Sequence, residues 1–215
     1  MQQLLIIKKL KKDSTIDSEM SESICDSLIR QKLLVFPVDA VYGLLCVFSS
    51  ENLRKCEDLV KSAAIKNRPV IVTNFNMLEQ TAAITKKEYD FLRRIWPDEI
   101  NVILNGNTAN GYSEKVETRI PRFQFILDIL SQTSKPLLFF PLTGANGRTI
   151  FRKKDITDKF SSCTDSIIYL NEWSRTHVSP TVIDISSGSL EIVEKGKIAL
   201  EEIQSLYFLD TSDGN

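Results

Sequence analysis

The stretch LLVFPVDAVYGLLCVF, residues 33–48, decides the fold of this 215-residue chain. It holds two short apolar runs rich in β-branched and aromatic residues, a pattern typical of buried strands. Pro37 fixes φ and removes a backbone donor where the first run ends. Gly43 permits either a close backbone approach or a turn with positive φ before the second run. We therefore predict a strand, a turn and a second strand. Asp39 lies between them, either simply solvated or at a strand end where ligands collect in α/β sheets.

The composition indicates an ordinary globular protein, with 42% hydrophobic and 26% charged residues. A formal net charge of −1 excludes general electrostatic attraction to nucleic acid or membranes. Contact with RNA would require one of the basic clusters at 8–12 and 152–154, each of which otherwise forms a solvated surface. We expect no contact with a membrane, because no apolar stretch is long enough for a transmembrane helix. The charges near the start follow the apolar run, unlike those of a signal peptide, so a cytoplasmic location is expected.

The cysteines and the single histidine limit the chemistry that we expect. The four cysteines show no CxxC pair and no metal-like spacing, so reduced thiols and no metal site are predicted. With His177 as the only histidine, a site with several histidine ligands is excluded. His177 and Ser179 are sequence neighbours outside any nucleophile elbow, which disfavours a Ser/His nucleophile.

The remaining chain alternates predicted strands and helices without a break in composition. The first helix should bury Met20, Ile24, Leu28 and Ile29, and Ser49 or Ser50 should cap the second. Because there is no repeat or low-complexity linker, we predict a single α/β domain over 1–210 with a frayed tail at 211–215. Strands are predicted at 4–8, 69–73, 101–104, 116–120, 137–140, 167–170, 181–185 and 190–193, and helices at about 14–31, 49–60, 77–95 (one or two), 123–130 and 201–207.

The residues FPVDAVYGL, 36–44, resemble the Pro-Thr-Asp-Thr-Val-Tyr-Gly-Leu signature of the YrdC-like domain family, the threonylcarbamoyl-AMP synthase (YrdC-YciO-YwlC) type. The resemblance implies an α/β fold with a twisted, mixed, open sheet and helices packed on it. It also implies synthesis of threonylcarbamoyl-AMP from L-threonine, bicarbonate and ATP, with Mg²⁺ accompanying ATP, for tRNA modification. Contact with tRNA or double-stranded RNA would be consistent with that role. Val38 and Ala40 occupy two positions where the signature has hydroxyl residues.

Other family motifs imply which residues form the site. The Lys-x-Arg element matches either Lys61-Ser62-Ala63 or Lys66-Asn67-Arg68. The spacing from Gly43 favours Lys61, with Arg68 approaching from the loop; alternatively Lys66 and Arg68 simply face solvent. Thr118-Arg119-Ile120-Pro121 resembles the arginine-before-proline element. A guanidinium at a strand end can grip a carboxylate or phosphate at two points, although a structural salt bridge is the alternative.

Two later segments resemble family loops in weakened form. LTGANG, 142–147, resembles Ser-Thr-Ser-Ala-Asn, and VSPTVID, 178–184, resembles Pro-Ser-Thr-Val-Val-Asp. The resemblance therefore implies catalytic roles for Lys61 and Arg119. It implies substrate or nucleotide binding by Asp39, Tyr42, Lys66, Arg68, Thr143, Asn146, Ser179 and Thr181.

Departures from the family pattern leave more than one function open. Five positions lose a polar or cationic group or gain a wrong charge, and each such loss costs about 1–3 kcal/mol of ligand binding. The chain is then a divergent threonylcarbamoyl-AMP synthase, or a catalytically eroded relative that binds nucleotide, RNA or a partner protein. A hydrolase or another transferase on the same scaffold rests on fold analogy alone. The five positions are Val38, Ala63, Gly144, Pro180 and Glu194.

Overall fold

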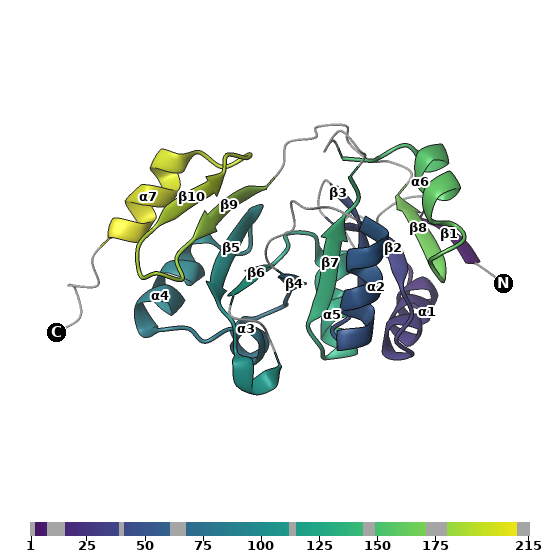
Figure 1. Ribbon diagram of the computed structural model, residues 1–215, viewed down its shortest axis with the longest axis horizontal. Coiled ribbons are helices and arrows are strands. Elements are labelled where there is room, and N and C mark those ends of the chain that lie inside the picture. Colours follow the sequence, from purple (N-terminus) through teal and green to yellow (C-terminus); the bar gives the residue numbers. More distant parts are fainter. Residues whose placement is uncertain are drawn as a thin grey trace. The chain divides into compact units, whose positions relative to one another are not determined.

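The computed structural model describes residues 3–7, 16–38, 41–60, 68–111, 115–143, 149–170 and 180–209. The chain divides into two compact units (Figure 1). Unit 1 comprises Met1–Lys66 and Phe123–His177, and unit 2 comprises Asn67–Arg122 and Val178–Asn215. The single domain over 1–210 stays a prediction.

The two predicted strands of residues 33–48 lie within the sheet of unit 1, and Pro37, where the first strand was expected to end, lies inside it. β2 (Leu34–Val38) pairs antiparallel with β3 (Val41–Val47), with Leu34 opposite Leu45 and Val38 opposite Val41. β7 (Leu137–Pro141) lies antiparallel on the other side of β3. β8 (Ser166–Leu170) is parallel to β2, and β1 (Gln3–Ile7) is parallel to β8. The strand order in this unit is therefore β1-β8-β2-β3-β7, a mixed sheet as predicted.

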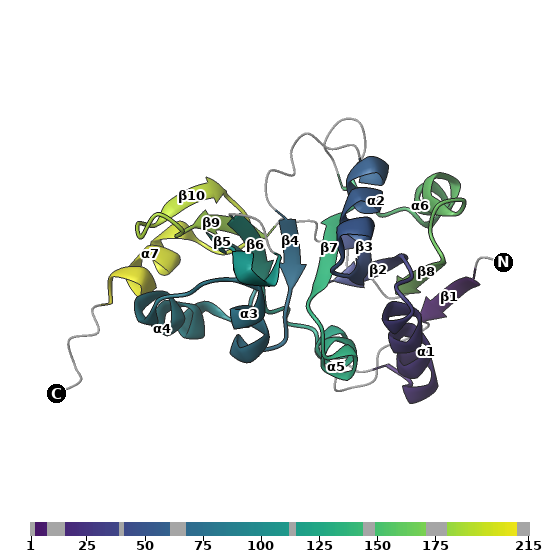
Figure 2. The same ribbon diagram turned by 60° about the horizontal axis from the view of Figure 1, so that its bottom comes forward.

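Helices cover both faces of the unit 1 sheet (Figure 2). On one face lie α1 (Ser18–Ile29) and α5 (Gln124–Thr133), where the rings of Phe36 and Phe125 are 5.7 Å apart. On the other lie α2 (Ser50–Val60) and α6 (Lys153–Phe160), and the Sγ atoms of Cys46 and Cys56 are 3.7 Å apart between β3 and α2. This arrangement explains why every residue of β2 is buried.

Gly43 lies inside β3, opposite Pro141 of β7. A methyl group at position 43 would lie 2.8 Å from the carbonyl oxygen of Phe140 and would overlap the ring of Phe139. Of the two roles predicted for this glycine, the structure therefore shows the close approach rather than the turn.

The strands of unit 2 lie in the order β4-β6-β5-β9-β10 and are also mixed in direction. β6 (Lys115–Arg119) lies between β4 (Arg68–Ile71), to which it is parallel, and β5 (Ile100–Asn105), to which it is antiparallel. β9 (Thr181–Asp184) is parallel to β5, and β10 (Glu191–Glu194) closes the edge antiparallel to β9. Figure 2 shows α3 (Phe75–Thr81), α4 (Lys86–Ile95) and α7 (Leu200–Phe208) on one side of this sheet. The short helix η1 spans Thr108–Asn110.

Helix ends follow the capping rules that the sequence indicates. The Asp17 carboxylate accepts from Glu19 N at 3.0 Å, and Ser49 Oγ accepts from Asn52 N at 3.1 Å, so Ser49 rather than Ser50 caps α2. Thr85 and Glu88 form a capping box at the start of α4.

Two details of the sequence analysis need correction or completion. Ile29, predicted to be inward, is 53% exposed, because Leu28 faces the core and the next residue is rotated by 100° around the helix. Helix α6 was not predicted.

The tail at 211–215 lies outside the described residues. None of the helices within the described ranges is long and apolar enough to cross a membrane.

Candidate functional site

In unit 1 the structure brings together two of the predicted binding residues, Tyr42 and Thr143. The backbone N–H of Leu142 donates to the Tyr42 carbonyl at 2.8 Å, which places Thr143 beside the start of β3. The Tyr42 ring is buried and packs edge-on against Tyr169 with centroids 5.7 Å apart. Lys159 Nζ donates to the Thr143 carbonyl at 3.4 Å. This end of the sheet therefore combines an aromatic ring, a threonine and a lysine.

Several predicted residues lie outside the described part of the chain, and their roles stay predictions. Arg68 is described only through its backbone, as the first residue of β4 opposite Val116. The choice between the two Lys-x-Arg alignments therefore stays open. The predicted residues outside the described ranges are Asp39, Lys61, Lys66, Asn146 and Ser179.

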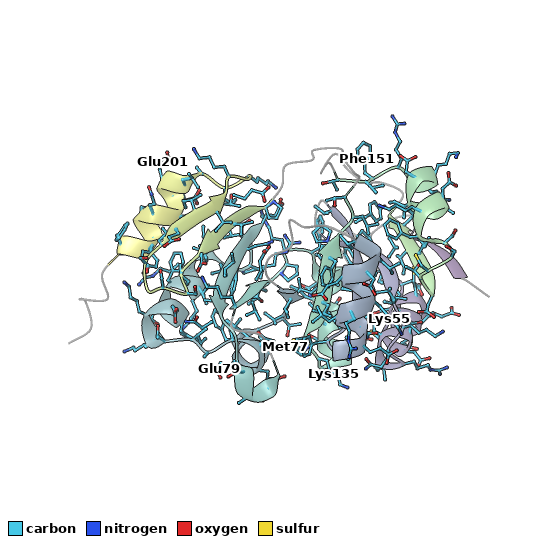
Figure 3. All side chains as sticks on the ribbon, viewed as in Figure 1. Lys55, Met77, Glu79, Lys135, Phe151 and Glu201 are labelled. Carbon is cyan, nitrogen blue, oxygen red and sulfur yellow. The ribbon has the colours of Figure 1, made fainter. Side chains whose placement is uncertain are left out.

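A cavity of about 570 Å³ opens at the opposite end of the unit 1 sheet from Tyr42. It is lined by Val47 at the end of β3 and by Gln31, Lys55 and Lys135, among others. Figure 3 labels Lys55 and Lys135 at this end. Lys55 pairs with Glu51 at 2.7 Å, which is an i,i+4 contact along α2. Because β3 runs from Val41 to Val47, this cavity is separate from the predicted site.

In unit 2 the predicted anion contact Arg119 is the last residue of β6 and is only 4% exposed. Its carbonyl oxygen accepts from Val72 N at 3.1 Å, just beyond the end of β4. On its other edge, β6 pairs with β5 as far as Thr118, the residue before Arg119. The backbone of Arg119 is therefore held at the end of β6, and its side chain is of the type that can bind an anion at two points.

Two polar residues that the sequence analysis did not single out share a sheet face with Arg119. Glu117 is two residues earlier on β6, and Asn101 comes opposite Arg119 in the register that pairs Val102 with Thr118. Asn101 Nδ2 donates to Glu117 Oε1 at 2.6 Å. The buried Asn101 Oδ1 has no hydrogen-bond partner among the described residues. We call Asn101, Glu117 and Arg119 the polar cluster of unit 2.

The electrostatic environment makes Glu117 the most unusual member of this cluster. Burial raises the pKa of its carboxyl, and the nearby Glu194 carboxylate raises it further. The hydrogen bond from Asn101 and the charge of Arg119 act in the opposite direction, but the net shift is upward. The sequence signal for this face was the alternation of Glu117 and Arg119 with Val116 and Thr118, whose side chains point the other way.

An ion pair flanks the cluster on the same face. Lys115 Nζ lies 2.8 Å from Asp184 Oδ2, joining β6 to β9. Burial by itself would raise the pKa of Asp184, but hydrogen bonds from Lys115 and Ser186 outweigh that effect and lower it. Asp184 is therefore held as a carboxylate.

Thr181 lies on the opposite face of the unit 2 sheet from Arg119. It pairs with Ile100, whereas the next residue, Val182, pairs with Asn101. Its hydroxyl donates to the Ile198 carbonyl at 3.0 Å and accepts from Ile198 N at 3.1 Å. The structure thus gives this hydroxyl two backbone partners and does not bring it beside Arg119.

Replacing Thr181 with valine should lower the free energy of unfolding by about 2 kcal/mol. The backbone N–H and the carbonyl of Ile198 would each lose the hydrogen bond that they make with the Thr181 hydroxyl. The matched control is Thr118→Val on the same sheet. Thr118 is buried, and its hydroxyl has no partner among the described residues, so this change should be neutral or stabilising. Urea denaturation measures both. Equal losses for the two variants would contradict the structural role of the Thr181 hydroxyl.

No group of three or more His, Cys, Asp or Glu side chains comes together in a metal-binding arrangement within the described ranges.

The chain is similar to known proteins mainly at the level of family and fold. The family model Sua5/YciO/YrdC, described as "Telomere recombination", matches residues 26–196. No curated protein matches the chain. Among solved structures, a variant of P. abyssi Sua5 superposes with a TM-score of 0.81 at 19% identity, covering 95% of this chain. P. abyssi Sua5 complexed with L-threonine superposes with a TM-score of 0.80 at 19% identity over 94% of this chain.

E. coli YciO is also similar, with a TM-score of 0.80 at 16% identity, and here 94% of this chain covers 100% of that protein. By contrast, the chain spans only 60% of the length of the two Sua5 structures. The shared α/β fold, with a mixed sheet and helices packed on it, confirms the predicted fold class.

Proposed function

Because this chain belongs to the Sua5/YciO/YrdC family, we propose that it is a threonylcarbamoyl-AMP synthase-like enzyme that uses L-threonine, bicarbonate and ATP. The observation that carries the proposal is the family match over 26–196, which includes the β2–β3 hairpin and Arg119. That a Sua5 of similar fold is complexed with L-threonine supports threonine as one substrate.

The proposed reaction has two balanced parts. The threonine ammonium group and bicarbonate give a carbamate, water and a proton. A carbamate oxygen then forms a bond to the α-phosphorus of ATP, while the bond to the β-phosphate oxygen breaks and pyrophosphate leaves. Mg²⁺ enters as part of the ATP substrate and would neutralise charge on the phosphates.

The residues of this chain would contribute positioning and charge rather than a covalent bond. Negative charge accumulates where the carbamate meets the phosphates, so a buried, strand-held guanidinium such as that of Arg119 is suited to stabilise it. Lys61 is proposed as the second cation. Tyr42 and Thr143, which the chain brings together at the start of β3, are proposed to contact substrate.

Incubating the purified protein with ATP, Mg²⁺, L-threonine and bicarbonate tests the proposal. We expect a product with the mass of threonylcarbamoyl-AMP and one pyrophosphate per product, both requiring all three substrates. Mass spectrometry and a pyrophosphate assay measure them. Pyrophosphate release without this product, or no release, would refute the synthase.

A second candidate function is a catalytically eroded relative that binds nucleotide or RNA, or acts through protein interaction. It is favoured by the carboxyl groups of Glu117 and Glu194, which influence each other, because negative charge beside Arg119 on β6 weakens the binding of phosphates. Thermal shift separates the candidates, since a ligand that binds the native state raises the melting temperature. A shift with ATP or RNA but no turnover would favour the eroded relative. Contact with tRNA and a cytoplasmic location stay predictions.

A further inference from the structure

Two buried thiols face each other between β3 and α2 in unit 1. Cys46 of β3 and Cys56 of α2 are both fully buried, and their Sγ atoms are 3.7 Å apart. A disulfide bond is about 2.05 Å long, so the two sulfurs would have to approach by only about 1.7 Å to form one. The helix and the strand therefore hold two thiols close enough to react with each other.

The other two cysteines have no such neighbour. The Cys25 thiol lies 3.8 Å from the carbonyl oxygen of Ile129, and the Cys163 thiol donates to the carbonyl of Phe160 at 3.4 Å. Among the described residues, neither has a second sulfur within hydrogen-bond distance. Cys163 is also less buried than the other three cysteines. The chain thus carries one pair of thiols and two single thiols, which serve as internal controls.

The surroundings of the pair favour the reduced form in the resting protein. The hydrogen bond with Cys46 and then burial raise the pKa of the Cys56 thiol, and they outweigh the opposite effect of Lys55. Because the thiolate is the reactive form, a raised pKa makes Cys56 slow to react. Other side chains cover both sulfurs, so a large oxidant such as another protein cannot reach them directly. We therefore expect the pair to respond only to small oxidants.

The cavity at the end of β3 lies next to the pair along the chain. Its lining includes Val47, which follows Cys46, and Lys55, which precedes Cys56. Most of the remaining segment between the two cysteines lines it as well. A volume of about 570 Å³ is far larger than the roughly 30 Å³ that one water molecule occupies, so hydrogen peroxide fits inside. A small oxidant can therefore come within one residue of each thiol.

We propose that Cys46 and Cys56 form an oxidation site, at which a peroxide converts the two thiols into a disulfide that links α2 to β3. One sulfur of the pair attacks a peroxide oxygen, the O–O bond breaks, and a sulfenic acid and water form. The second sulfur then attacks the sulfenic sulfur, an S–S bond forms, and the hydroxyl leaves with the thiol proton as water. In total the two thiols are oxidised to the disulfide, and one hydrogen peroxide is reduced to two water molecules. The inference does not depend on the proposed function.

The disulfide would stabilise the attachment of α2 to the sheet. It would close a loop over residues 46–56, which contains the end of β3 and the first turns of α2. Such a link reduces the freedom of the unfolded chain, so we expect the oxidised protein to melt about 5 °C higher than the reduced protein. A melting temperature that did not rise would overturn the stabilising role of the link.

Peptide mapping of the full chain tests whether the disulfide forms. The protein is treated with hydrogen peroxide, the remaining thiols are alkylated, and the chain is digested with trypsin without reduction. Trypsin cleaves after Arg54 and Lys55, so Cys46 and Cys56 fall on separate peptides, 33–54 and 56–61, which only a disulfide joins. We expect this linked pair to be the main disulfide and to disappear after treatment with dithiothreitol. Mass spectrometry measures it. Alkylated Cys46 and Cys56 in a sample whose Cys163 is oxidised would overturn the inference.

Two substitutions assign the effects to the pair. Cys46→Ala should give no linked peptides and no rise in melting temperature after the same treatment. The control Cys163→Ala removes a single thiol and should behave like the unmodified chain. A Cys46→Ala protein whose melting temperature rose with peroxide as much as that of the unmodified chain would refute the role of the link. If Cys46→Ala fails to fold, the peptide map of the unmodified chain still decides whether the disulfide forms.

Discussion

Replacing Arg119 with alanine is expected to lower the rate of threonylcarbamoyl-AMP formation by at least about a hundredfold, which corresponds to about 2.7 kcal/mol of transition-state stabilisation. Arg119 is buried at the end of β6, and its backbone is fixed by β4. Water that enters the space left by the side chain carries no positive charge, so it would not stabilise the negative charge of the transition state as a fixed guanidinium does. Steady-state kinetics with each substrate varied in turn measure the loss.

Arg122→Ala is the matched control for this prediction. Arg122 belongs to the same unit, is exposed, and pairs with Asp98 at 3.4 Å, so its removal should change the rate by less than about twofold. Arg119→Lys should recover only part of the activity, because an ammonium cannot bind an anion at two points. If Arg119→Ala and Arg122→Ala had similar rates while both remained folded, Arg119 would have no role in the reaction.

The largest expected loss of stability is that of Gly43→Ala, at about 3 kcal/mol in the free energy of unfolding. The added methyl group would lie 2.8 Å from the Phe140 carbonyl oxygen, and that oxygen belongs to a strand that pairs with β3. Backbone in the middle of a sheet has little room to move, so the strain falls on the β3–β7 pairing. Urea denaturation measures the change.

Gly111→Ala separates this steric effect from backbone strain. Gly111 has a φ of +80°, and a methyl group there would meet nothing within 4 Å. This substitution should therefore lower the free energy of unfolding by only about 1 kcal/mol, because alanine is strained in the left-handed conformation that Gly111 adopts. A Gly43→Ala protein no less stable than Gly111→Ala would contradict the close approach between β3 and β7.

The hairpin was predictable because its information is local. Two apolar runs separated by a short polar turn specify antiparallel strands, and Asp17 and Ser49 provide helix caps that the sequence itself displays. Helix α6 was missed because its buried face consists only of Ile156 and Phe160 among charged residues. A pair at i,i+4 is too short a signal to indicate a helix without the sheet that it covers.

The site was predicted less completely, and for a physical reason. The motif around Arg119 indicated an anion contact, but Asn101 and Glu117 become neighbours only when β5 pairs with β6 in one particular register. Likewise, the motif around Thr181 did not indicate that the Thr181 hydroxyl would bind the backbone of Ile198. The alternation of side chains along β9 determines this direction. The contact between Asn101 and Glu117 and the direction of the Thr181 hydroxyl both depend on how strands distant in the sequence pair. A single sequence does not show that pairing.

The path of the chain through the two units has a consequence for any attempt to dissect the protein. Each unit is assembled from two separate segments, since residues 67–122 are inserted between the halves of unit 1 and unit 2 is completed only by residues 178–215. A fragment ending at residue 122 would lack β7 and β8 of unit 1 together with β9, β10 and α7 of unit 2. No single cut therefore separates the two units, and a chain that ends before residue 166 lacks β8 of unit 1 as well as β9 and β10 of unit 2.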